Sequence, residues 1–590
     1  MYTARRYLAR RGIAISFSFL CIFAILVLLL IACSSERKEK EWELVKDKNT
    51  IKSYIHFLEK YPKSKYSPTA QKRIDSLMFE SARRINTIFS YHHFLKRFPD
   101  SEYRNEVLKL VKNLKKNWHP AMGDVQTVQL RIEESFPEGY SIDKKRITWV
   151  VGLILQRLPV DVVSDDVEKA DALLQIKIKG EALKGYYTGN LKGTHYTGAI
   201  VSGSITLKRD VREIFSFSFY HKRSPAQEIS REYPKAGDAP FYEAFENSGY
   251  DRRLFLELRE ICQLPPVLLW KDGKKDLIFT SPTVVDGTLY VGSKDNNIYA
   301  LDTKDGAVIW KFRMEDNVSA SPTVVDGIVY IGSRDDNIYA LDAKDGAVIW
   351  KFRMEDRVST SPTVVDGIVY VGSRDDNIYA LDAKDGAVIW KFDTKYPLST
   401  NPTVVDGTLY VCSGQNIYAL DANDGALIWK FDTKDHLSTN PTVVDGTLYV
   451  CSGQNIYVLD ANDGAMIRKF DTENHLSTSP TVVDGIVYVG SRDDNIYALD
   501  AKDGAVIWKF DTEDYPLGSP TFVDGTVYVC SGENIYALDA SSGLLKWRFL
   551  TGTLNLRILT GMDIPKPAIS NGKVYVSTYD GWIFAFKQIK

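Results

Sequence analysis

The sequence predicts a multidomain, mainly β chain in which an eight-bladed β-propeller follows an α-helical repeat hairpin and a small α+β domain. Two internal repeats lead to this prediction. The phrase PTVVDG recurs from Pro282 onward every 39 or 40 residues, and a helical pattern near the N-terminus repeats after 37 residues. Periods of this size indicate arrays of supersecondary units. The expected segments are a signal peptide at 1–32, helical repeats at 33–118, an α+β domain at 119–263 and the propeller at 264–590.

Each unit of the longer repeat contains four short strands. PTVV ends in Asp286-Gly287, a strong hairpin signal because both central positions of the turn need φ > 0. TLYVG, NIYALD and AVIWKF follow, so the unit is an antiparallel meander. Its apolar residues stand at consecutive positions, such as 289–291, which requires burial on both faces. Sheets stacked around a central axis provide that burial, so the unit is a propeller blade.

Counting the strands predicts how the ring closes. The first three strands occur eight times, the last copy beginning at Pro567. Fourth strands also occur eight times, but the one around Trp270 precedes the first copy of the other three. We therefore expect the Trp270 strand to complete the last blade, which would remove exposed sheet edges.

The Ala-Leu-Asp, Asp-Gly and Trp positions of each unit resemble the eight-bladed pyrroloquinoline-quinone-type (PQQ-like) propeller repeat. The propeller is also similar to that of the propeller lipoproteins of the outer-membrane β-barrel assembly machine. In the PQQ-like family a Trp docks each blade on its neighbour. The resemblance implies this role for Trp270, Trp310, Trp350, Trp390, Trp429, Trp508 and Trp547, whereas Arg468 breaks the series and predicts a weaker junction or a polar partner for the arginine.

The N-terminus has the features of a targeting signal. Four Arg residues precede an uncharged, mostly apolar run from Ile13 to Ala32. Leu30–Cys33 then resembles the lipobox of bacterial lipoproteins, which implies cleavage before Cys33 and a diacylglycerol on its thiol. An uncleaved transmembrane helix is the alternative, because about 20 apolar residues span a bilayer. Arg5-Arg6 also faintly resembles a twin-arginine signal, and Ser34 implies outer-membrane delivery by the enterobacterial family rule.

The shorter repeat relates residues 42–66 to residues 79–103. Asn or Thr before each apolar stripe suits a helix N-cap, and Pro62 and Pro99 stop the helices. The pattern resembles tetratricopeptide-type hairpins of outer-membrane assembly lipoproteins. Two copies are fewer than the three usually needed for independent stability, so we expect them to pack on the next domain or on a partner. A peptide-binding groove and a structural spacer both remain open.

The segment 119–263 carries no strong motif. Strands are expected at 127–136, 160–163, 172–180, 199–209 and 214–221, and helices at 146–157 and 241–262. It weakly resembles small α/β domains of envelope lipoproteins. Tyr186, Tyr187, His195 and Tyr196 belong to a predicted glycine-rich hairpin loop, which is either a ligand or partner surface or a flexible connection.

Three cysteines, Cys412, Cys451 and Cys530, replace the glycine of YVGS in three blades. Each reads as a small buried residue in a tight strand. A disulfide between Cys412 and Cys451 is the alternative in an oxidising compartment, although neighbouring blades usually separate such positions too far.

The propeller sequence argues against an active site. In the resembled family, quinoprotein dehydrogenases use calcium, an adjacent Cys-Cys disulfide and a catalytic Asp. This sequence has no Cys-Cys, and each blade copies the last, whereas a site needs singular residues that converge. We therefore expect no catalytic residues, no cofactor and no metal. The singular features are Arg468, the loop residues His436 and His475, and the apolar Leu554, Leu556 and Ile558 of an insertion, which would serve partner docking or packing across the ring closure.

These features predict a non-enzymatic, membrane-anchored periplasmic scaffold in the cell envelope, on the outer membrane and facing the periplasm. The expected partners are the lipid membrane, through an acyl anchor on Cys33, and other envelope proteins; no nucleic acid is expected, and the chain is a monomer or part of a hetero-complex. A small-ligand or glycan-binding sensor and a PQQ-dependent dehydrogenase are the alternative functions.

Overall fold

The structure is a computed structural model, and two compact units, Met1–Ser81 and Ala82–Lys590, are described separately. The predicted signal peptide, Cys33, Leu554, Leu556, Ile558 and the predicted helices at 146–157 and 241–262 lie outside the described residues. The structure describes residues 38–115, 127–135, 161–163, 172–187, 193–209, 212–223, 268–273, 277–278, 280–551 without 473, 515, 517 and 533, 566–578 and 581–588.

The first unit is helical. Residues 38–48 form a helix, followed by α3 (Ile51–Lys60) and most of α4 (Ser67–Ile85), which continues into the second unit. Thr50 caps α3 through a capping box with Ser53. The buried Trp42 ring stacks on Tyr66 with centroids 4.9 Å apart, so the aromatic stripe of the first repeat copy forms a small core.

The second repeat copy forms α5 (Ile88–Arg97) and α6 (Arg104–Lys115). Thr87 caps α5 through the same box with Ser90, so the predicted N-caps are confirmed in both copies. Tyr91 and Phe94 are buried. No helix among the described residues is long and apolar enough to cross a membrane.

A five-stranded sheet follows, in the order β2-β1-β3-β4-β5. β1 pairs in parallel with β2 and β3, and the other pairs are antiparallel. β3 and β4 form the predicted hairpin, but the placement of Tyr186 and His195 in its loop was wrong, because Tyr186 pairs with Thr194 and His195 with Gly185 in the ladder. Aromatic and β-branched residues favour strands, and in this segment that preference outweighs the tendency of the glycines to form a loop. The strands are β1 (Thr127–Ser135), β2 (Asp161–Val163), β3 (Ala172–Tyr187), β4 (Gly193–Arg209) and β5 (Arg212–Arg223).

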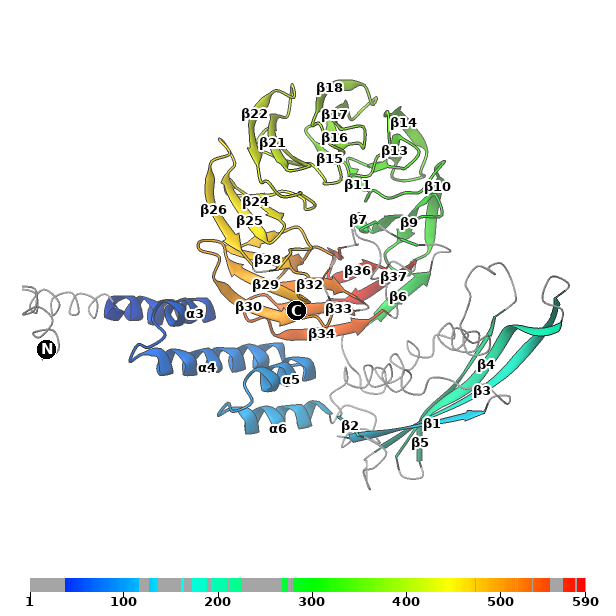
Figure 1. The fold of residues 1–590 in the computed structure, drawn as a ribbon, viewed down its shortest axis with the longest axis vertical. Coiled ribbons are helices and arrows are strands. Elements are labelled where there is room, and N and C mark those ends of the chain that lie inside the picture. The colour runs from blue at the N-terminus through cyan, green and yellow to red at the C-terminus, as the bar shows by residue number, and fades with distance from the viewer. Residues whose placement is uncertain are drawn as a thin grey trace, which may run out of the picture. The chain divides into compact units, whose positions relative to one another are not determined.

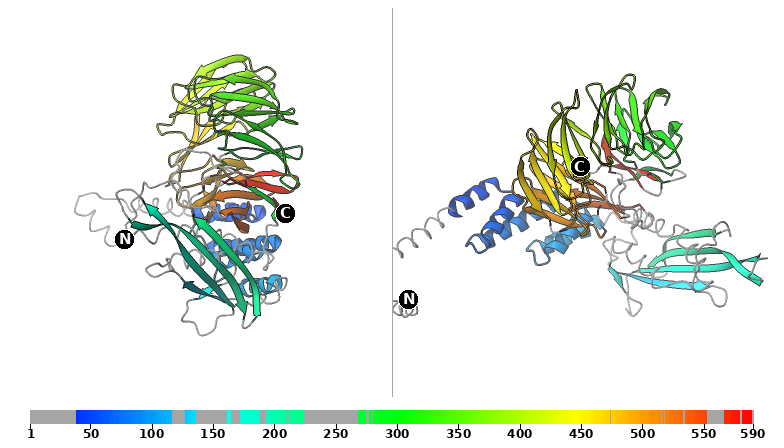
Figure 2. Two further views of the ribbon diagram at one scale, coloured as in Figure 1. Left: turned by 90° about the vertical axis from the view of Figure 1, so that its right-hand side faces the viewer. Right: turned by 45° about the horizontal axis from the view of Figure 1, so that its top comes forward.

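Eight four-stranded antiparallel sheets then form the propeller, arranged radially around an axis (Figures 1 and 2). The first strand of each blade lies nearest the centre and the fourth lies at the outside (Figure 1). The second and third strands are buried on both faces, as their continuous apolar runs predict.

The strands of blades 1 to 4 are as follows: β7 (Thr283–Val285), β8 (Thr288–Gly292), β9 (Asn297–Asp302) and β10 (Val308–Arg313); β11 (Thr323–Val325), β12 (Ile328–Gly332), β13 (Asn337–Asp342) and β14 (Val348–Arg353); β15 (Thr363–Val365), β16 (Ile368–Gly372), β17 (Asn377–Asp382) and β18 (Val388–Asp393); β19 (Thr403–Val405), β20 (Thr408–Ser413), β21 (Asn416–Asp421) and β22 (Leu427–Asp432).

Blades 5 to 8 repeat this pattern: β23 (Thr442–Val444), β24 (Thr447–Ser452), β25 (Asn455–Asp460) and β26 (Met466–Asp471); β27 (Thr481–Val483), β28 (Ile486–Gly490), β29 (Asn495–Asp500) and β30 (Val506–Asp511); β31 (Thr521–Val523), β32 (Thr526–Ser531), β33 (Asn534–Asp539) and β34 (Leu545–Leu550); β35 (Ala568–Ser570), β36 (Lys573–Ser577), β37 (Trp582–Lys587) and β6 (Leu268–Gly273).

The last blade confirms the predicted ring closure. β6, which precedes every copy of the propeller repeat in sequence, pairs antiparallel with β37, and Trp270 lies opposite Ala585. The inner rim is closed as well, because the Lys566 amide donates to Ser281 Oγ at 3.0 Å. Each blade is thus a complete four-stranded sheet.

Two glycines, one in blade 2 and one in blade 3, allow the cost of backbone strain to be compared with the cost of a steric clash. Gly346 and Gly367 have φ of 76° and 77°, conformations that L-residues rarely adopt. A Cβ on Gly346 would lie 2.6 Å from the Trp310 ring, whereas one on Gly367 would meet nothing within 4 Å.

We predict that Gly367→Ala destabilises the propeller by about 1 kcal/mol, the cost of a left-handed non-glycine residue. Gly346→Ala should cost about 2–4 kcal/mol, because overpacking adds to the same strain. Denaturant unfolding of both variants measures the difference. An equal loss of unfolding free energy in the two variants would mean that the Trp310 ring can move away from the added methyl group without cost.

Candidate functional site

Neighbouring blades share one backbone carbonyl at each regular junction. Trp310 Nε1 donates to the Ala343 carbonyl of the next blade at 2.9 Å, and Tyr290 Oη donates to the same oxygen at 3.1 Å. One carbonyl oxygen has two lone pairs and accepts both bonds. The other predicted docking residues make the same contact: Trp270 with Thr303, Trp350 with Ala383, Trp390 with Ala422, Trp429 with Ala461 and Trp508 with Ala540.

Two junctions depart from this pattern. Trp547 is buried, but its Nε1 has no hydrogen-bond partner within the described part of the chain. Arg468 is exposed and donates to the Lys502 carbonyl, which gives the arginine the polar partner considered from the sequence. Phe470 is buried and approaches Gly504, the position that a Trp ring meets in the regular blades. An aromatic ring two residues further along thus fills the place that Arg468 leaves.

The two loop histidines lie apart from Arg468. His436 and His475 are exposed, in loops that lead from one blade to the next. Their carbonyl groups accept from Ser452 Oγ and Ser491 Oγ, which ties the loops to the sheets. The structure therefore does not bring the histidines and Arg468 together into one site.

The cysteines Cys412, Cys451 and Cys530 are free thiols, and no disulfide joins Cys412 to Cys451. Burial raises the thiol pKa of all three, that of Cys530 to about 12. Thiols in this state are poor nucleophiles, so they serve as small core residues.

The sequence did not predict the most elaborate contact of the second unit, where helix α5 docks on the outer strand of blade 7. Thr87 Oγ1 donates to the Lys546 carbonyl at 2.8 Å, and the Leu545 amide donates to His93 Nδ1 at 3.0 Å. Side chains of a helix thus bind backbone groups of β34, an edge strand. An edge that would otherwise be open to other strands is covered.

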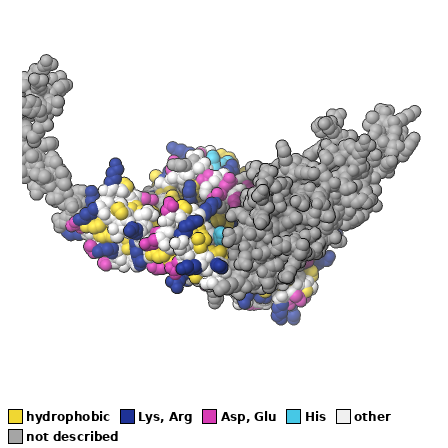
Figure 3. All heavy atoms as spheres, turned by 90° about the horizontal axis from the view of Figure 1, so that it is seen from below, with side chains coloured by type: hydrophobic (Ala, Val, Ile, Leu, Met, Phe, Trp, Pro, Cys, Tyr) yellow, Lys and Arg dark blue, Asp and Glu magenta, His cyan; other side chains and the backbone are white. Residues whose placement is uncertain are grey.

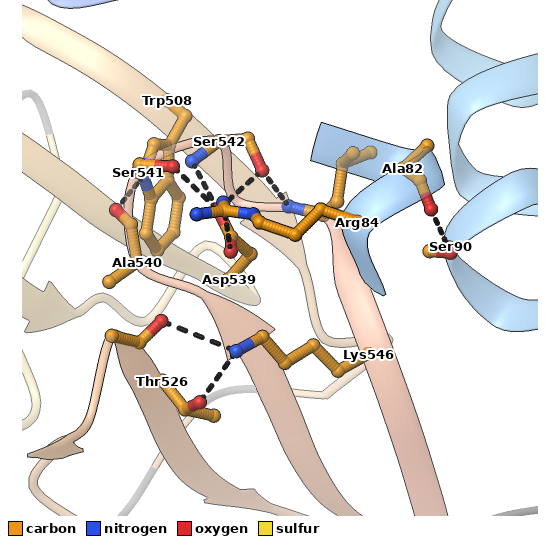
Figure 4. A network of polar contacts seen from close by, with 12 residues as sticks. Ala82, Arg84, Ser90, Trp508, Thr526, Asp539, Ala540, Ser541, Ser542 and Lys546 are labelled. Carbon is orange, nitrogen blue, oxygen red and sulfur yellow. Dashed lines mark hydrogen bonds and ion pairs between the residues drawn. The ribbon is translucent and has the colours of Figure 1, made fainter. Parts of the chain in front are cut away.

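A charged contact just before the N-terminus of α5 also joins this helical segment to blade 7 (Figure 4). Arg84, near the end of α4, donates to Asp539 Oδ2 at 3.0 Å. The other carboxylate oxygen, Oδ1, accepts from Ser541 Oγ and from the amide and hydroxyl of Ser542. Asp539 is 3% exposed, so it is a buried carboxylate with both oxygens satisfied.

Lys546 points away from that carboxylate, toward blade 7 itself (Figure 4). Its Nζ donates to Thr526 Oγ1 at 2.7 Å. Burial lowers the pKa of this ammonium group. The lysine replaces an isoleucine found at the same position of the regular blades, such as Ile507 in blade 6.

His93 forms the centre of the contact. Its ring meets Phe510 of blade 6 edge-on, with centroids 5.2 Å apart and planes at 87°. Burial, helped by the nearby charges of Arg97 and Lys96, lowers the pKa of His93 to about 3. The imidazole is therefore neutral near pH 7, which leaves Nδ1 free to accept the Leu545 amide proton.

The signal for this contact was present in the sequence. Blade 7 reads SSGLLKW where blade 6 reads KDGAVIW, a departure at five positions that lie under the helix or in the adjoining turn. The departure could be noticed, but the helix that fits it lies more than 440 residues away in sequence. Only the tertiary structure connects the two.

Figure 3 shows hydrophobic, basic and acidic side chains interspersed on the described part of one face. Among the described residues, no group of three or more His, Cys, Asp or Glu side chains could hold a metal ion.

Comparison with known families identifies the propeller. The family model of the outer membrane protein assembly factor BamB matches residues 268–372, 294–399, 334–450 and 452–589, which together are more than half of the chain. The chain belongs to the BamB family. The PQQ-like propeller expected from the sequence is thereby confirmed.

Solved structures with similar folds include a BamB and two dehydrogenases. BamB from Moraxella catarrhalis is 19% identical, with 55% of this chain and 98% of that chain covered and a TM-score of 0.47. Quinohemoprotein alcohol dehydrogenase ADHIIG from Pseudomonas putida HK5 is 16% identical over 55% and 76% of the two chains, with a TM-score of 0.44. A europium-containing methanol dehydrogenase is 15% identical over 55% and 93%, with a TM-score of 0.46. These likenesses carry no information on activity. No curated protein sequence matches the chain.

The docked histidine predicts that stability depends on pH. An unfolded histidine has a pKa near 6.5, whereas that of folded His93 is about 3. The contribution of neutral His93 to the free energy of unfolding is therefore complete above pH 6.5 and is lost as pH falls toward 3. Between pH 7 and pH 5 the free energy of unfolding should fall by about 1–2 kcal/mol.

His93→Asn keeps an acceptor near the Nδ1 position but cannot titrate in this range. We expect this variant to lose less stability between pH 7 and pH 5 than the wild type, in denaturant unfolding at both pH values. His436→Asn, at an exposed loop position, is the control and should behave as the wild type. Identical pH dependence in all three proteins would contradict the half-buried, neutral state of His93.

Proposed function

We propose that the chain is a non-enzymatic, membrane-anchored scaffold that holds envelope proteins together during outer-membrane protein assembly. One observation carries the proposal: the BamB family model spans the whole propeller, from residue 268 to residue 589. The family description names an outer membrane protein assembly factor, and the same role is proposed here. The proposed location is the periplasmic face of the outer membrane, with Cys33 as the lipid anchor.

The architecture supports a binding role. Propeller blades offer repeated, rigid surfaces, and the contact between α5 and blade 7 is an example of a helix bound on such a surface. Polar groups on the inner rim are used to hold the ring together, since Thr283 Oγ1 donates to the Pro322 carbonyl of the next blade at 2.6 Å. The same bond recurs from blade to blade as far as Thr521 and Pro567.

This uniformity also supports the non-enzymatic part of the proposal. A catalytic site requires particular side chains that converge at one place. Here the inner-rim threonines and the turn aspartates repeat with the blades, and the adjacent Cys-Cys pair of the quinoprotein dehydrogenases does not occur in the sequence.

In-cell crosslinking of the full-length protein, followed by mass spectrometry, tests the scaffold function. We expect reproducible crosslinks to envelope proteins, among them proteins that take part in outer-membrane assembly. Recovery of no reproducible partner would reject the proposal. A dye-linked dehydrogenase activity on addition of pyrroloquinoline quinone and Ca²⁺ would instead favour the alternative function, a PQQ-dependent dehydrogenase.

Substitution of Cys33 tests the anchor separately. We expect Cys33→Ala to leave the membrane fraction or to accumulate as a larger, unprocessed precursor, because the thiol that carries the lipid is gone. Membrane fractionation and the mass of the mature chain are the measurements. Ser34→Ala, which keeps the cysteine, is the control, and an unchanged mature mass in Cys33→Ala would contradict lipidation at this residue.

A further inference from the structure

The outer strands of blades 2 to 5 present a surface that is covered in blade 7. In blade 2, Val348 and Ile349 are 45% and 44% exposed at the start of β14. The equivalent residues of blade 7, Leu545 and Lys546, are 8% and 7% exposed because α5 lies on them. Exposed aliphatic pairs on an edge strand invite a binding partner.

The groups that receive α5 on blade 7 recur on these blades. Three of them are the turn carboxylate of Asp539, the backbone of the outer strand, and Phe510 on the preceding blade. Blade 2 repeats the set with Asp342, the backbone of Val348 and Ile349, and Phe312, which is half-buried. Blades 3, 4 and 5 repeat the set in the same register, and we name each set a rim site.

Two neighbouring blades lack a complete rim site. Blade 1 follows β6, which carries Asp272 at the position of the phenylalanine. Blade 6 follows blade 5, where Phe470 has turned inward to fill the place that Arg468 leaves. Blade 8 also lacks a complete set, because Lys587 stands where the other blades have the turn aspartate. Within the described part of the propeller, the complete, uncovered set is therefore confined to blades 2 to 5.

We propose that the rim sites bind an amphipathic helix of another envelope protein, one with a basic residue three positions before its N-cap, a Ser or Thr N-cap and an aromatic or apolar face. The chemistry follows from α5. Arg84 meets the turn carboxylate, the Thr87 hydroxyl meets a strand carbonyl, and the covering face excludes water from the apolar pair. The inference rests on the proposed scaffold function and gives it a surface and a class of partner.

A second copy of this chain fits these sites less well. Its helix α5 is already seated on its own blade 7. The equivalent helix of the first repeat, α3, carries Lys52 where α5 has the buried Phe89. The segment before α3 also carries Asp47 where the segment before α5 carries Arg84, so a carboxylate would face the turn carboxylate of a rim site, and a foreign helix is the better occupant.

The test uses the full-length protein and a stapled helical peptide with the sequence of residues 82–98, labelled with a fluorophore and a photoreactive group. A staple is needed because so short a helix is marginal in water. The rim variant combines Ile349→Gln, Ile389→Gln, Ile428→Gln and Ile467→Gln, which change no charge and lie at half-exposed positions. Tyr396→Gln, which removes a 51% exposed aromatic side chain from a loop between blades, is the matched control.

We expect saturable binding to the wild type and to the Tyr396 control, at least tenfold weaker binding to the rim variant, and photolabelling of outer strands in blades 2 to 5. A peptide with Arg84→Glu should bind at least tenfold more weakly, because its carboxylate would face the turn carboxylate. Absence of binding to the wild type, or an unchanged affinity of the rim variant, overturns the proposal. Labelling confined to blade 7 also overturns it and would indicate exchange of α5 between copies. Envelope partners recovered by crosslinking after such a failure would leave the scaffold function intact and place its surface elsewhere.

Discussion

The propeller depends on one carbonyl group shared at each regular blade junction. A Trp from the fourth strand and a Tyr from the second strand of one blade both donate to it, as Trp310 and Tyr290 do to Ala343. The Trp ring lies against a glycine of the next blade, where a Cβ would collide with it. Burial of a Trp side chain, roughly 150–250 Å² at about 25 cal/mol per Å², contributes up to about 4–6 kcal/mol per junction. Every junction joins only nearest neighbours, and the junction made by Trp508 is regular although the preceding one carries Arg468.

The same constraint explains where the blades are free to diverge. The Tyr of the second strand and the Trp of the fourth strand form the junctions, whereas most other residues of the fourth strand are exposed in the regular blades. Blade 7 has diverged there to receive α5, with Lys546 in place of an isoleucine and two serines in the preceding turn. The edge is satisfied by side chains of the helix and not by a fifth strand. A repeated scaffold can in this way carry one particular attachment without disturbing its neighbours.

Local physics made most of the fold predictable from sequence. The Asp-Gly turns, the consecutive apolar positions and the 40-residue spacing are local or periodic signals, and they predicted the blades, their number and the strand that closes the ring. The threonine N-caps were equally readable. The docking site was not, because His93 and Leu545 are far apart in sequence and neither residue type alone indicates a contact. The loop around Tyr186 was mispredicted because glycine was read as a turn signal where strand pairing prevails.

The order of strands in the closing blade has a consequence for biogenesis. β6 leaves the ribosome before any copy of the propeller repeat, and its partner β37 is the last strand to leave. Chains are made from the N-terminus, so blade 8 can assemble only when synthesis is nearly finished. Pairing across such a separation carries a large loop-closure cost and folds slowly unless the intervening blades form first and bring the two ends together. A prematurely terminated chain would expose the Trp270 strand and the flank of blade 1, which marks it as incomplete to any protease or chaperone that reads unpaired edges.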